Sequence, residues 1–304
     1  MGSVTGRLGY AFLFVSWVCF GQLVSVVPRE RLAHRAEREP STFRLDVKLI
    51  EIPVSVKDLH DRPVLGLAQG GFRLFEDGAE QQIVAFSRVD APVSAGLVFD
   101  SSGSMRHRIQ DSRAAVEQFL KTSMPGDDFS LVTFADKPEL AAAFTPDFNE
   151  ISRRLAATHA RGWTAMNDAI RLSIEEMRRA ANPRRVLLVL SDGGDNNSRY
   201  SEGELLSLVR ESDVRVYAIG LFERPKFLEK LADETGGGVI WVRNLNDLPD
   251  AMDRLSAQIR NEYSLGYYSD HAQNDGKYHK VKIEVKPPDA RPLQVSWRRG
   301  YTAP

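Results

Sequence analysis

The sequence contains a short run of oxygen-bearing side chains, Asp100-Ser101-Ser102-Gly103-Ser104-Met105, that could bind a metal ion. Asp100, Ser102 and Ser104 stand at alternate positions, so on a turn their oxygens can converge on one point. Hard cations such as Mg²⁺ take oxygen ligands in proteins. Asp and Ser are also favoured helix N-caps and turn residues, so this triplet alone leaves a metal site and a capped helix start both open.

Two more oxygen-bearing residues fit the same site. Asp192 follows an apolar run at 186–190, and Thr164 lies on a loop just before a helix expected from Met166. Parallel strands that end at Asp100 and Asp192 place both carboxylates at one rim of a sheet, where open α/β folds bind ligands. The loop that holds Thr164 opens at this rim as well. With all five residues in place, a metal site is favoured over a capped helix start.

The elements that must position these residues alternate between strands and helices from Val93 onwards. Such alternation predicts an α/β fold, a Rossmann-like, doubly wound and mostly parallel sheet with helices on both faces. Short apolar runs predict the strands, at 94–100, 128–134, 185–191, 215–220 and 238–242. Apolar residues at helical spacing predict the helices, at 109–122, 166–180, 202–212, 225–234 and 248–262.

β-type sequence flanks this α/β segment on both sides. From Arg44 apolar and polar residues alternate, with a change of phase near Ile50 that predicts a bulge. Asp77-Gly78 predicts the turn of a hairpin between 72–76 and 82–86. Alternation returns after Tyr263. We therefore expect residues 44–92 and 263–304 to form one small β-sandwich, into which the α/β domain, residues 93–262, is inserted.

The N-terminus differs in character from the rest of the chain. Residues 1–27 combine one Arg with a long apolar run, which predicts a signal peptide, with cleavage before Gln22 favoured over an uncleaved membrane anchor. Residues 28–43 are rich in Arg and Glu and predict a charged linker. Either alternative places the body outside the cytoplasm: periplasmic, secreted or anchored at the outer face of the membrane. The one cysteine, Cys19, lies in the apolar run, so the body has no thiol.

Composition and motifs exclude several functional classes. The 304 residues include 40 Lys and Arg against 41 Asp and Glu, so bulk charge gives no support for nucleic-acid binding. No Gly-x-Ser-x-Gly, His-Glu-x-x-His or phosphate loop is present, and Gly236–Gly238 ends a helix rather than opening one. His107 and His159 are candidate bases, but an exposed loop histidine is the favoured interpretation. We predict that the protein is not an enzyme.

Asp-x-Ser-x-Ser, a Thr about sixty residues later and then Asp-Gly resemble the metal-ion-dependent adhesion site of von Willebrand factor type A domains. The resemblance covers about residues 93–262 and implies that Ser102, Ser104 and Thr164 supply hydroxyl ligands, while Asp100 and Asp192 act mainly through bound waters. It also implies Mg²⁺, or Mn²⁺ or Ca²⁺, as the ion. In this family the open position of the ion usually binds a carboxylate of a partner protein.

Flanking motifs resemble a narrower group, the exported von Willebrand factor A-related proteins common in acidobacteria. These motifs are Phe75-Glu76-Asp77-Gly78, Gln81-x-Ile83, Tyr263-x-Leu265-Gly266-Tyr267 and Gly300-Tyr301. The function implied by the adhesion site is that of an exported, cation-dependent protein-binding module whose partner presents an acidic residue. The alternatives are a scaffold or assembly subunit with a structural metal and a Mg²⁺-dependent hydrolase. Arg106, Arg161 and Arg199 suggest a basic rim that selects an acidic partner.

Overall fold

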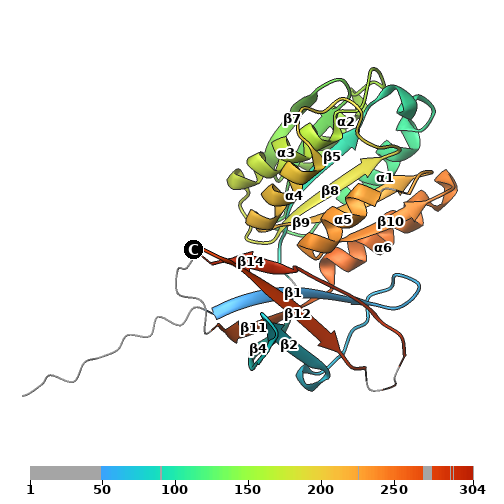
Figure 1. The fold of residues 1–304 in the computed structure, drawn as a ribbon. Coiled ribbons are helices and arrows are strands. Elements are labelled where there is room, and N and C mark those ends of the chain that lie inside the picture. Colours follow the sequence, from blue (N-terminus) through green and yellow to red (C-terminus); the bar gives the residue numbers. More distant parts are fainter. Residues whose placement is uncertain are drawn as a thin grey trace, which may run out of the picture. The chain divides into compact units, whose positions relative to one another are not determined.

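A six-stranded sheet with the order β10-β9-β8-β5-β6-β7 forms the centre of the α/β part of the computed structural model (Figure 1). The structure describes residues 49–303 except Asp90, Pro225, 270–275, Pro288 and Ala290. The strands are β5 Ser94–Asp100, β6 Asp128–Phe134, β7 Pro138–Thr145, β8 Arg185–Ser191, β9 Val214–Leu221 and β10 Gly238–Val242. All neighbouring pairs are parallel except β6 and β7. The predicted α/β fold class is therefore confirmed.

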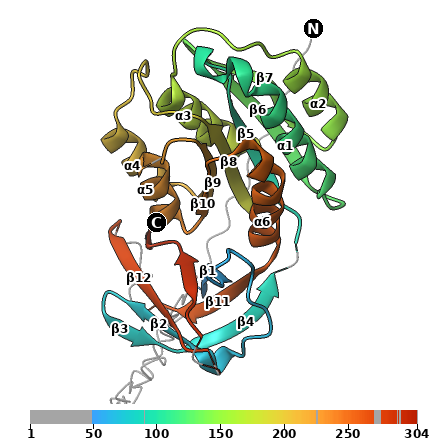
Figure 2. The ribbon, with the colours of Figure 1, turned by 90° about the vertical axis from the view of Figure 1, so that its right-hand side faces the viewer.

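Helices cover both faces of this sheet. They are α1 Ile109–Lys121, α2 Phe148–Ala156, α3 Met166–Glu176, α4 Glu202–Glu211, α5 Lys226–Thr235 and α6 Leu248–Arg260. Buried residues of α1, α2 and α6 pack on one face, and those of α3, α4 and α5 pack on the other (Figure 2). The central strand β8 contacts both layers, which explains its continuous apolar run. The short 3₁₀ turns Gly103–His107 (η2) and Met177–Arg179 (η3) precede α1 and follow α3.

Two antiparallel sheets form the β-sandwich part. One has the order β13-β1-β11-β4, and the other has the order β14-β12-β2-β3. The strands are β1 Leu49–Lys57, β2 Phe72–Glu76, β3 Ala79–Gln81, β4 Ile83–Val89, β11 Glu262–Tyr268, β12 Tyr278–Val285, β13 Gln294–Trp297 and β14 Gly300–Thr302. Each sheet combines strands from before and after the α/β segment, and their facing side chains form a third core.

Several predicted details were wrong. The hairpin pairs β2 with β3, whereas residues 83–89 enter the other sheet as β4 and pair with β11. The register of β1 with β11 runs without interruption from Leu49 to Val54, so no bulge occurs there. The last helix ends at Arg260, and Glu262 begins β11 instead of ending the helix. Strand β7 and helix α2 were not predicted at all.

The flanking motifs meet inside the sandwich. The Glu76 carboxylate is fully buried and accepts hydrogen bonds from the hydroxyls of Tyr267 at 2.9 Å, Tyr301 at 2.6 Å and Ser269 at 2.7 Å. The Tyr263 hydroxyl donates to the Val64 carbonyl at 2.9 Å. Buried polar groups need such partners, because an unsatisfied one is costly. These motifs therefore stabilise the sandwich and lie away from the rim of the α/β sheet.

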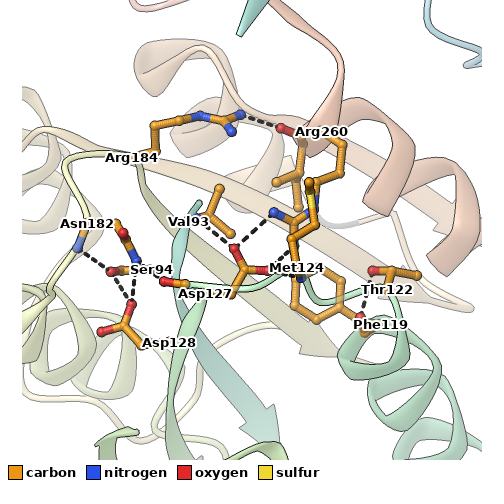
Figure 3. Close-up of polar contacts among 12 residues, drawn as sticks. Val93, Ser94, Phe119, Thr122, Met124, Asp127, Asp128, Asn182, Arg184 and Arg260 are labelled. Carbon is orange, nitrogen blue, oxygen red and sulfur yellow. Dashed lines mark hydrogen bonds and ion pairs between the residues drawn. The ribbon is translucent and has the colours of Figure 1, made fainter. Parts of the chain in front are cut away.

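Buried ion pairs stabilise the α/β part at the amino ends of its strands. The Asp127 carboxylate pairs with Arg260 and accepts the backbone N–H groups of Val93 at 2.8 Å and Met124 at 2.7 Å (Figure 3). Glu262 is fully buried and binds the guanidinium groups of Arg184 and Arg215. Breaking such a pair by removing one partner leaves an uncompensated buried charge.

The predicted signal peptide or anchor at 1–27 and the charged linker at 28–43 lie outside the described residues. Within the described part of the chain, no helix is both long enough and apolar enough to cross a membrane.

Candidate metal site at the carboxyl rim of the sheet

The carboxyl ends of β5 and β8 bring the predicted carboxylates to one rim of the sheet. The two strands are parallel neighbours, with Phe99 opposite Leu190, so Asp100 ends one strand and Asp192 directly follows the other. The side chains of this region differ in exposure: Asp100, Ser102, Thr164 and Asp192 are buried, whereas Ser104 is exposed. The candidate site is therefore anchored in the core and accessible from solvent at Ser104.

Four of the five predicted residues lie in one chain of hydrogen bonds. The Ser102 backbone N–H donates to Asp100 Oδ1 at 2.8 Å, and the hydroxyls of Ser102 and Ser104 lie 3.0 Å apart. The Ser104 hydroxyl donates to Asp192 Oδ1 at 2.7 Å. Side chains from two loops, which are separated by almost ninety positions in the chain, thus point at a common centre.

Thr164 lies on a third loop, which is tied to both others by backbone contacts. The Gly103 N–H donates to the Gly162 carbonyl at 3.0 Å, and the Thr164 N–H donates to Asn196 Oδ1 at 2.8 Å. Gly162 has a φ of +71°, and a Cβ there would meet the Asp136 carboxylate at 2.5 Å, so this turn needs glycine. These contacts join the Thr164 loop to the Asp100 loop and to the loop after Asp192, and in the described structure the Thr164 hydroxyl makes no hydrogen bond to the other four residues.

The loop residues Asp195, Asn196 and Asn197, which could suggest a second ion site, have a structural role. Asp195 accepts the Asn167 N–H at 3.2 Å, and Asn197 Nδ2 donates to the Asp136 carbonyl at 2.8 Å. The backbone N–H groups of Asn196 and Asn197 both donate to the Thr164 carbonyl. These contacts hold the Thr164 loop in position, as is common for Asp and Asn in turns.

The capped-helix interpretation of the triplet does not describe this loop. Helix α1 begins after Arg108, which makes no side-chain cap, and the Ser102 side chain makes no cap to the turn η2 that follows it. The hydroxyls of Ser102 and Ser104 face each other and Asp192 instead. Their oxygens are therefore directed to the rim rather than to the start of a helix.

Two residues of the site were not foreseen from the sequence. The Ser191 hydroxyl donates to Asp100 Oδ2 at 2.5 Å, so both oxygens of that carboxylate are held. The Arg108 guanidinium forms an ion pair with Asp192 Oδ2 and lies over the Phe222 ring, 4.1 Å from its centre. Phe222 has a φ of +65°, a left-handed conformation that is uncommon for a bulky residue. No local pattern signals these contacts, because they join distant parts of the chain.

Burial sets the electrostatics of the site. It raises the pKa of Asp100 above its ordinary value, against the opposing effect of hydrogen bonds from Ser102 and Ser191, and the nearby Asp192 charge raises it further. Two carboxylates with little solvent share this rim, and Arg108 is the cation that contacts one of them. The rim therefore favours an additional positive charge close to Asp100.

The chemistry of the five residues fits a hard divalent cation. Two carboxylates and three hydroxyls provide only oxygen donors, which suit Mg²⁺, Mn²⁺ or Ca²⁺ better than softer metals. The described residues contain no cluster of three or more His, Cys, Asp or Glu side chains that could hold a metal. The five candidate ligands include only two acids, so metal binding here would also need the three hydroxyls. His107 and His159 make no hydrogen bond to the five residues in the part that the structure describes.

Comparison with known proteins shows what the α/β part is similar to. Residues 97–194 match the family model of the von Willebrand factor type A domain. The heavy chain H4 of the inter-alpha-trypsin inhibitor of Sus scrofa is 32% identical over 162 residues, which are 48% of this chain and 18% of that protein. The Homo sapiens protein of the same name is 28% identical over 164 residues, with the same two shares. The chain thus spans less than a fifth of the length of these curated relatives.

Solved structures with similar folds include a von Willebrand factor type A protein from Catenulispora acidiphila, with a TM-score of 0.49 and 14% identity. The matched region covers 86% of this chain and 74% of the Catenulispora acidiphila chain. Another is the proximal thread matrix protein 1 of the mussel byssus with a zinc-occupied MIDAS motif. The TM-score is 0.49 and the identity is 20%, and the matched region covers 60% of this chain and 49% of the mussel protein. The resemblance to von Willebrand factor type A domains that was drawn from the sequence is confirmed by the family match.

Proposed function

We propose that the von Willebrand factor type A domain of this chain is a protein-binding module that depends on a divalent cation, with Mg²⁺ as the first candidate. Asp100, Ser102, Ser104, Thr164 and Asp192 would hold the ion. The observation that supports this proposal best is the hydrogen-bonded chain from Asp100 through Ser102 and Ser104 to Asp192 at the rim of the sheet.

The residues of the rim have distinct tasks in this proposal. Ser191 and the Ser102 N–H hold both oxygens of Asp100, which orients this carboxylate before any ligand arrives. Ser104 is exposed, so the site is reached from solvent on its side. When bound, the cation supplies an electrophilic position for a carboxylate of a partner protein. In this proposal the carboxylates and hydroxyls of the rim hold the ion and one another, so the proposed role is non-enzymatic.

Exposed arginine side chains around the rim support the proposal that the partner is acidic. Arg106, Arg161 and Arg199 are exposed, and none of them makes an ion pair with another described residue. Such charges steer an oppositely charged partner and make its binding sensitive to salt. Charge reversal of Arg106 and Arg161 should therefore weaken partner binding and its salt dependence. Unchanged affinity would remove the basic rim from the proposal.

Export is a further element of the proposal. The apolar N-terminal run and the absence of thiols after Cys19 support a periplasmic, secreted or membrane-anchored location on the outer side. A partner protein would then be met outside the cytoplasm. Fractionation of cells that express the tagged full chain, with the N-terminus of the mature protein determined by sequencing, tests this location.

The central experiment compares partner recovery with and without the cation. The full chain is used to capture proteins from the exported fraction in Mg²⁺ and in EDTA, in parallel with Ser102→Ala and Ser207→Ala. Ser207 is an exposed serine on α4, so it serves as the matched control. We expect recovery in Mg²⁺ from the parent and Ser207→Ala proteins alone. Equal recovery in EDTA, or unchanged recovery with Ser102→Ala, would contradict the proposal.

A further inference from the structure

A hollow of about 330 Å³ lies next to the candidate metal site, between β6, β7, α2 and the loop that follows α2. Ser101 of the metal-binding loop forms part of its wall, and so does Arg161. The two are joined directly, because the Arg161 N–H donates to the Ser101 carbonyl at 2.8 Å. This volume is within the range of sites that hold a small group of a ligand. A molecule bound at the rim could therefore place a second group in this hollow.

Positive charge dominates the lining of the hollow. Lys137, Arg154 and Arg161 contribute fixed positive charges, His159 lies beside them, and Glu139 is the one acid among the described residues of the lining. Lys137, Arg154 and Arg161 are exposed and make no ion pair with any described residue. Nearby Arg153, in contrast, pairs with Asp147 at 3.6 Å. The hollow thus has cationic groups whose charge is not used within the described structure.

The wall behind these charges is held in place. The Ser101 hydroxyl donates to the Phe134 carbonyl at 2.8 Å, and the Arg113 guanidinium donates to the Thr158 carbonyl. Phe134 itself is buried in the core. A hollow built on the ends of β6 and α2 keeps its shape without a ligand, which favours binding because little ordering is needed.

We propose that this hollow, which we call the basic subsite, binds a second carboxylate of the same partner that binds at the metal site. The inference rests on the proposed function and adds the chemistry of the partner: a peptide segment with two acidic residues separated by a short spacer. A protein partner is favoured by Trp163, which lies directly before Thr164 and is 64% exposed. Exposed tryptophans at a rim are frequent anchors in protein interfaces.

The test uses synthetic peptides as probes for the full chain. One peptide has a single aspartate among glycines, and the others have a second aspartate at a distance that increases by one glycine at a time. Affinities are measured by fluorescence anisotropy in Mg²⁺ and in EDTA at constant ionic strength. At the best spacing, the second aspartate should increase the affinity in Mg²⁺ about tenfold, as expected for a charge-assisted hydrogen bond.

Variants locate the effect. Arg154→Ala combined with Lys137→Ala should reduce the affinity of the two-aspartate peptide to that of the one-aspartate peptide, whereas Glu139→Gln should increase it. Arg178→Ala is the control, because Arg178 is also exposed but lies at the other end of the sheet, after α3. Thermal unfolding of each variant in Mg²⁺ shows whether fold and cation binding are retained, which is expected for substitutions at exposed positions.

The outcomes separate this inference from the proposed function. If the one-aspartate peptide binds in Mg²⁺ alone and the second aspartate adds nothing at any spacing, the basic subsite is wrong while the metal-dependent function stands. If no peptide distinguishes Mg²⁺ from EDTA, both fail. A heparin-derived oligosaccharide whose binding requires Arg154 and Lys137, together with no gain from the second aspartate, would also overturn the assignment to an acidic peptide.

Discussion

Replacement of Arg108 by Gln should increase the affinity of the site for Mg²⁺. Arg108 forms an ion pair with Asp192 Oδ2, while the other oxygen of that carboxylate accepts a hydrogen bond from Ser104. An ion held by Asp192 would therefore share this carboxylate with the guanidinium group. The positive charge of Arg108 opposes a second positive charge at the same place, and its removal takes that repulsion away.

The magnitude follows from Coulomb's law. The Arg108 side chain is 30% exposed, so solvent screens its charge strongly. For a monovalent and a divalent cation about 6 Å apart at a dielectric constant of about 80, the repulsion is about 1.4 kcal/mol, which corresponds to about a tenfold change in affinity. We expect a tenfold lower dissociation constant for Mg²⁺ at low salt, and a smaller difference at high ionic strength.

Arg108→Gln should lower the stability of the protein when no divalent cation is added, although it increases the affinity for Mg²⁺. The Asp192 side chain is only 1% exposed, and without Arg108 its charge has no cationic partner among the described residues. Arg108→Gln should therefore lower the melting temperature in EDTA, and saturating Mg²⁺ should restore it. The increase in melting temperature on addition of Mg²⁺ is then larger for the variant than for the parent protein.

Calorimetric titration with Mg²⁺ and thermal unfolding are the two assays. Arg106→Gln is the control, because it removes an equal charge from an exposed side chain of the same loop that has no ion pair with a described residue. Its effect on Mg²⁺ affinity should be less than about threefold, since exposed charges are well screened. A dissociation constant of Arg108→Gln equal to or higher than that of the parent would refute the reasoning.

Three further predictions concern the site and its supports. Ser102→Ala should abolish the rise in melting temperature caused by Mg²⁺ with little change in the circular dichroism spectrum, since the lost hydroxyl bonds to Ser104 and Asp100 within the site. Glu262→Leu should lower the free energy of unfolding in urea by about 3–5 kcal/mol, because it leaves Arg215 buried without its carboxylate; Glu262→Gln should cost less. For Asp127, burial raises the pKa, but the hydrogen bonds from Arg260, Met124 and Val93 outweigh it and hold the pKa below its ordinary value. A carboxylate with a depressed pKa stabilises the fold at pH values above its pKa in the unfolded chain. This stabilisation is lost as pH falls below about 4. Asp127→Asn should therefore be less stable than the parent at neutral pH, and urea titrations should show the difference shrinking in acid.

Much of the α/β part could be predicted because its signals are local. Strands β5, β6, β8 and β10 have the predicted bounds, since each is a short, largely apolar run between turn or helix signals. The edge strand β7 was missed because it alternates imperfectly and is largely half-buried. Helix α2 was missed because it is short and buries only Ile151 and Leu155, too few for a clear helical period.

The sandwich was predictable as a class but not in its strand pairing. Asp77 and Gly78 both have positive φ values and form the expected turn, yet the hairpin ends at Gln81. Residues Ile83–Val89 then pair with β11, which lies about 180 positions later in the chain. Whether a strand continues a hairpin or crosses to the facing sheet depends on such distant partners. The alternation of apolar residues specifies only the buried face.

The candidate metal site shows the same division between local and distant information. Asp100, Ser102 and Ser104 follow from one turn, and Asp192 follows from the rule that parallel strands end at a common rim. Nothing in the sequence around Arg108 links it to this site, yet its guanidinium reaches across to Asp192 and Phe222.

Arg108 is therefore the residue that distinguishes this site from its bare motif. Phe222, on which it rests, has its N–H bonded to the Val242 carbonyl at 2.8 Å and its carbonyl bonded to Trp241 Nε1 at 3.2 Å. The end of β10 thus fixes the ring that supports the guanidinium, and the guanidinium meets the carboxylate of Asp192. Because these contacts link the edge of the sheet to its rim, a change in the Arg108 pair on cation binding should also alter the surroundings of Trp241. Quenching of tryptophan fluorescence by acrylamide, compared between parent and Trp241→Phe proteins with and without Mg²⁺, measures this link, and identical quenching in all four samples would disprove it.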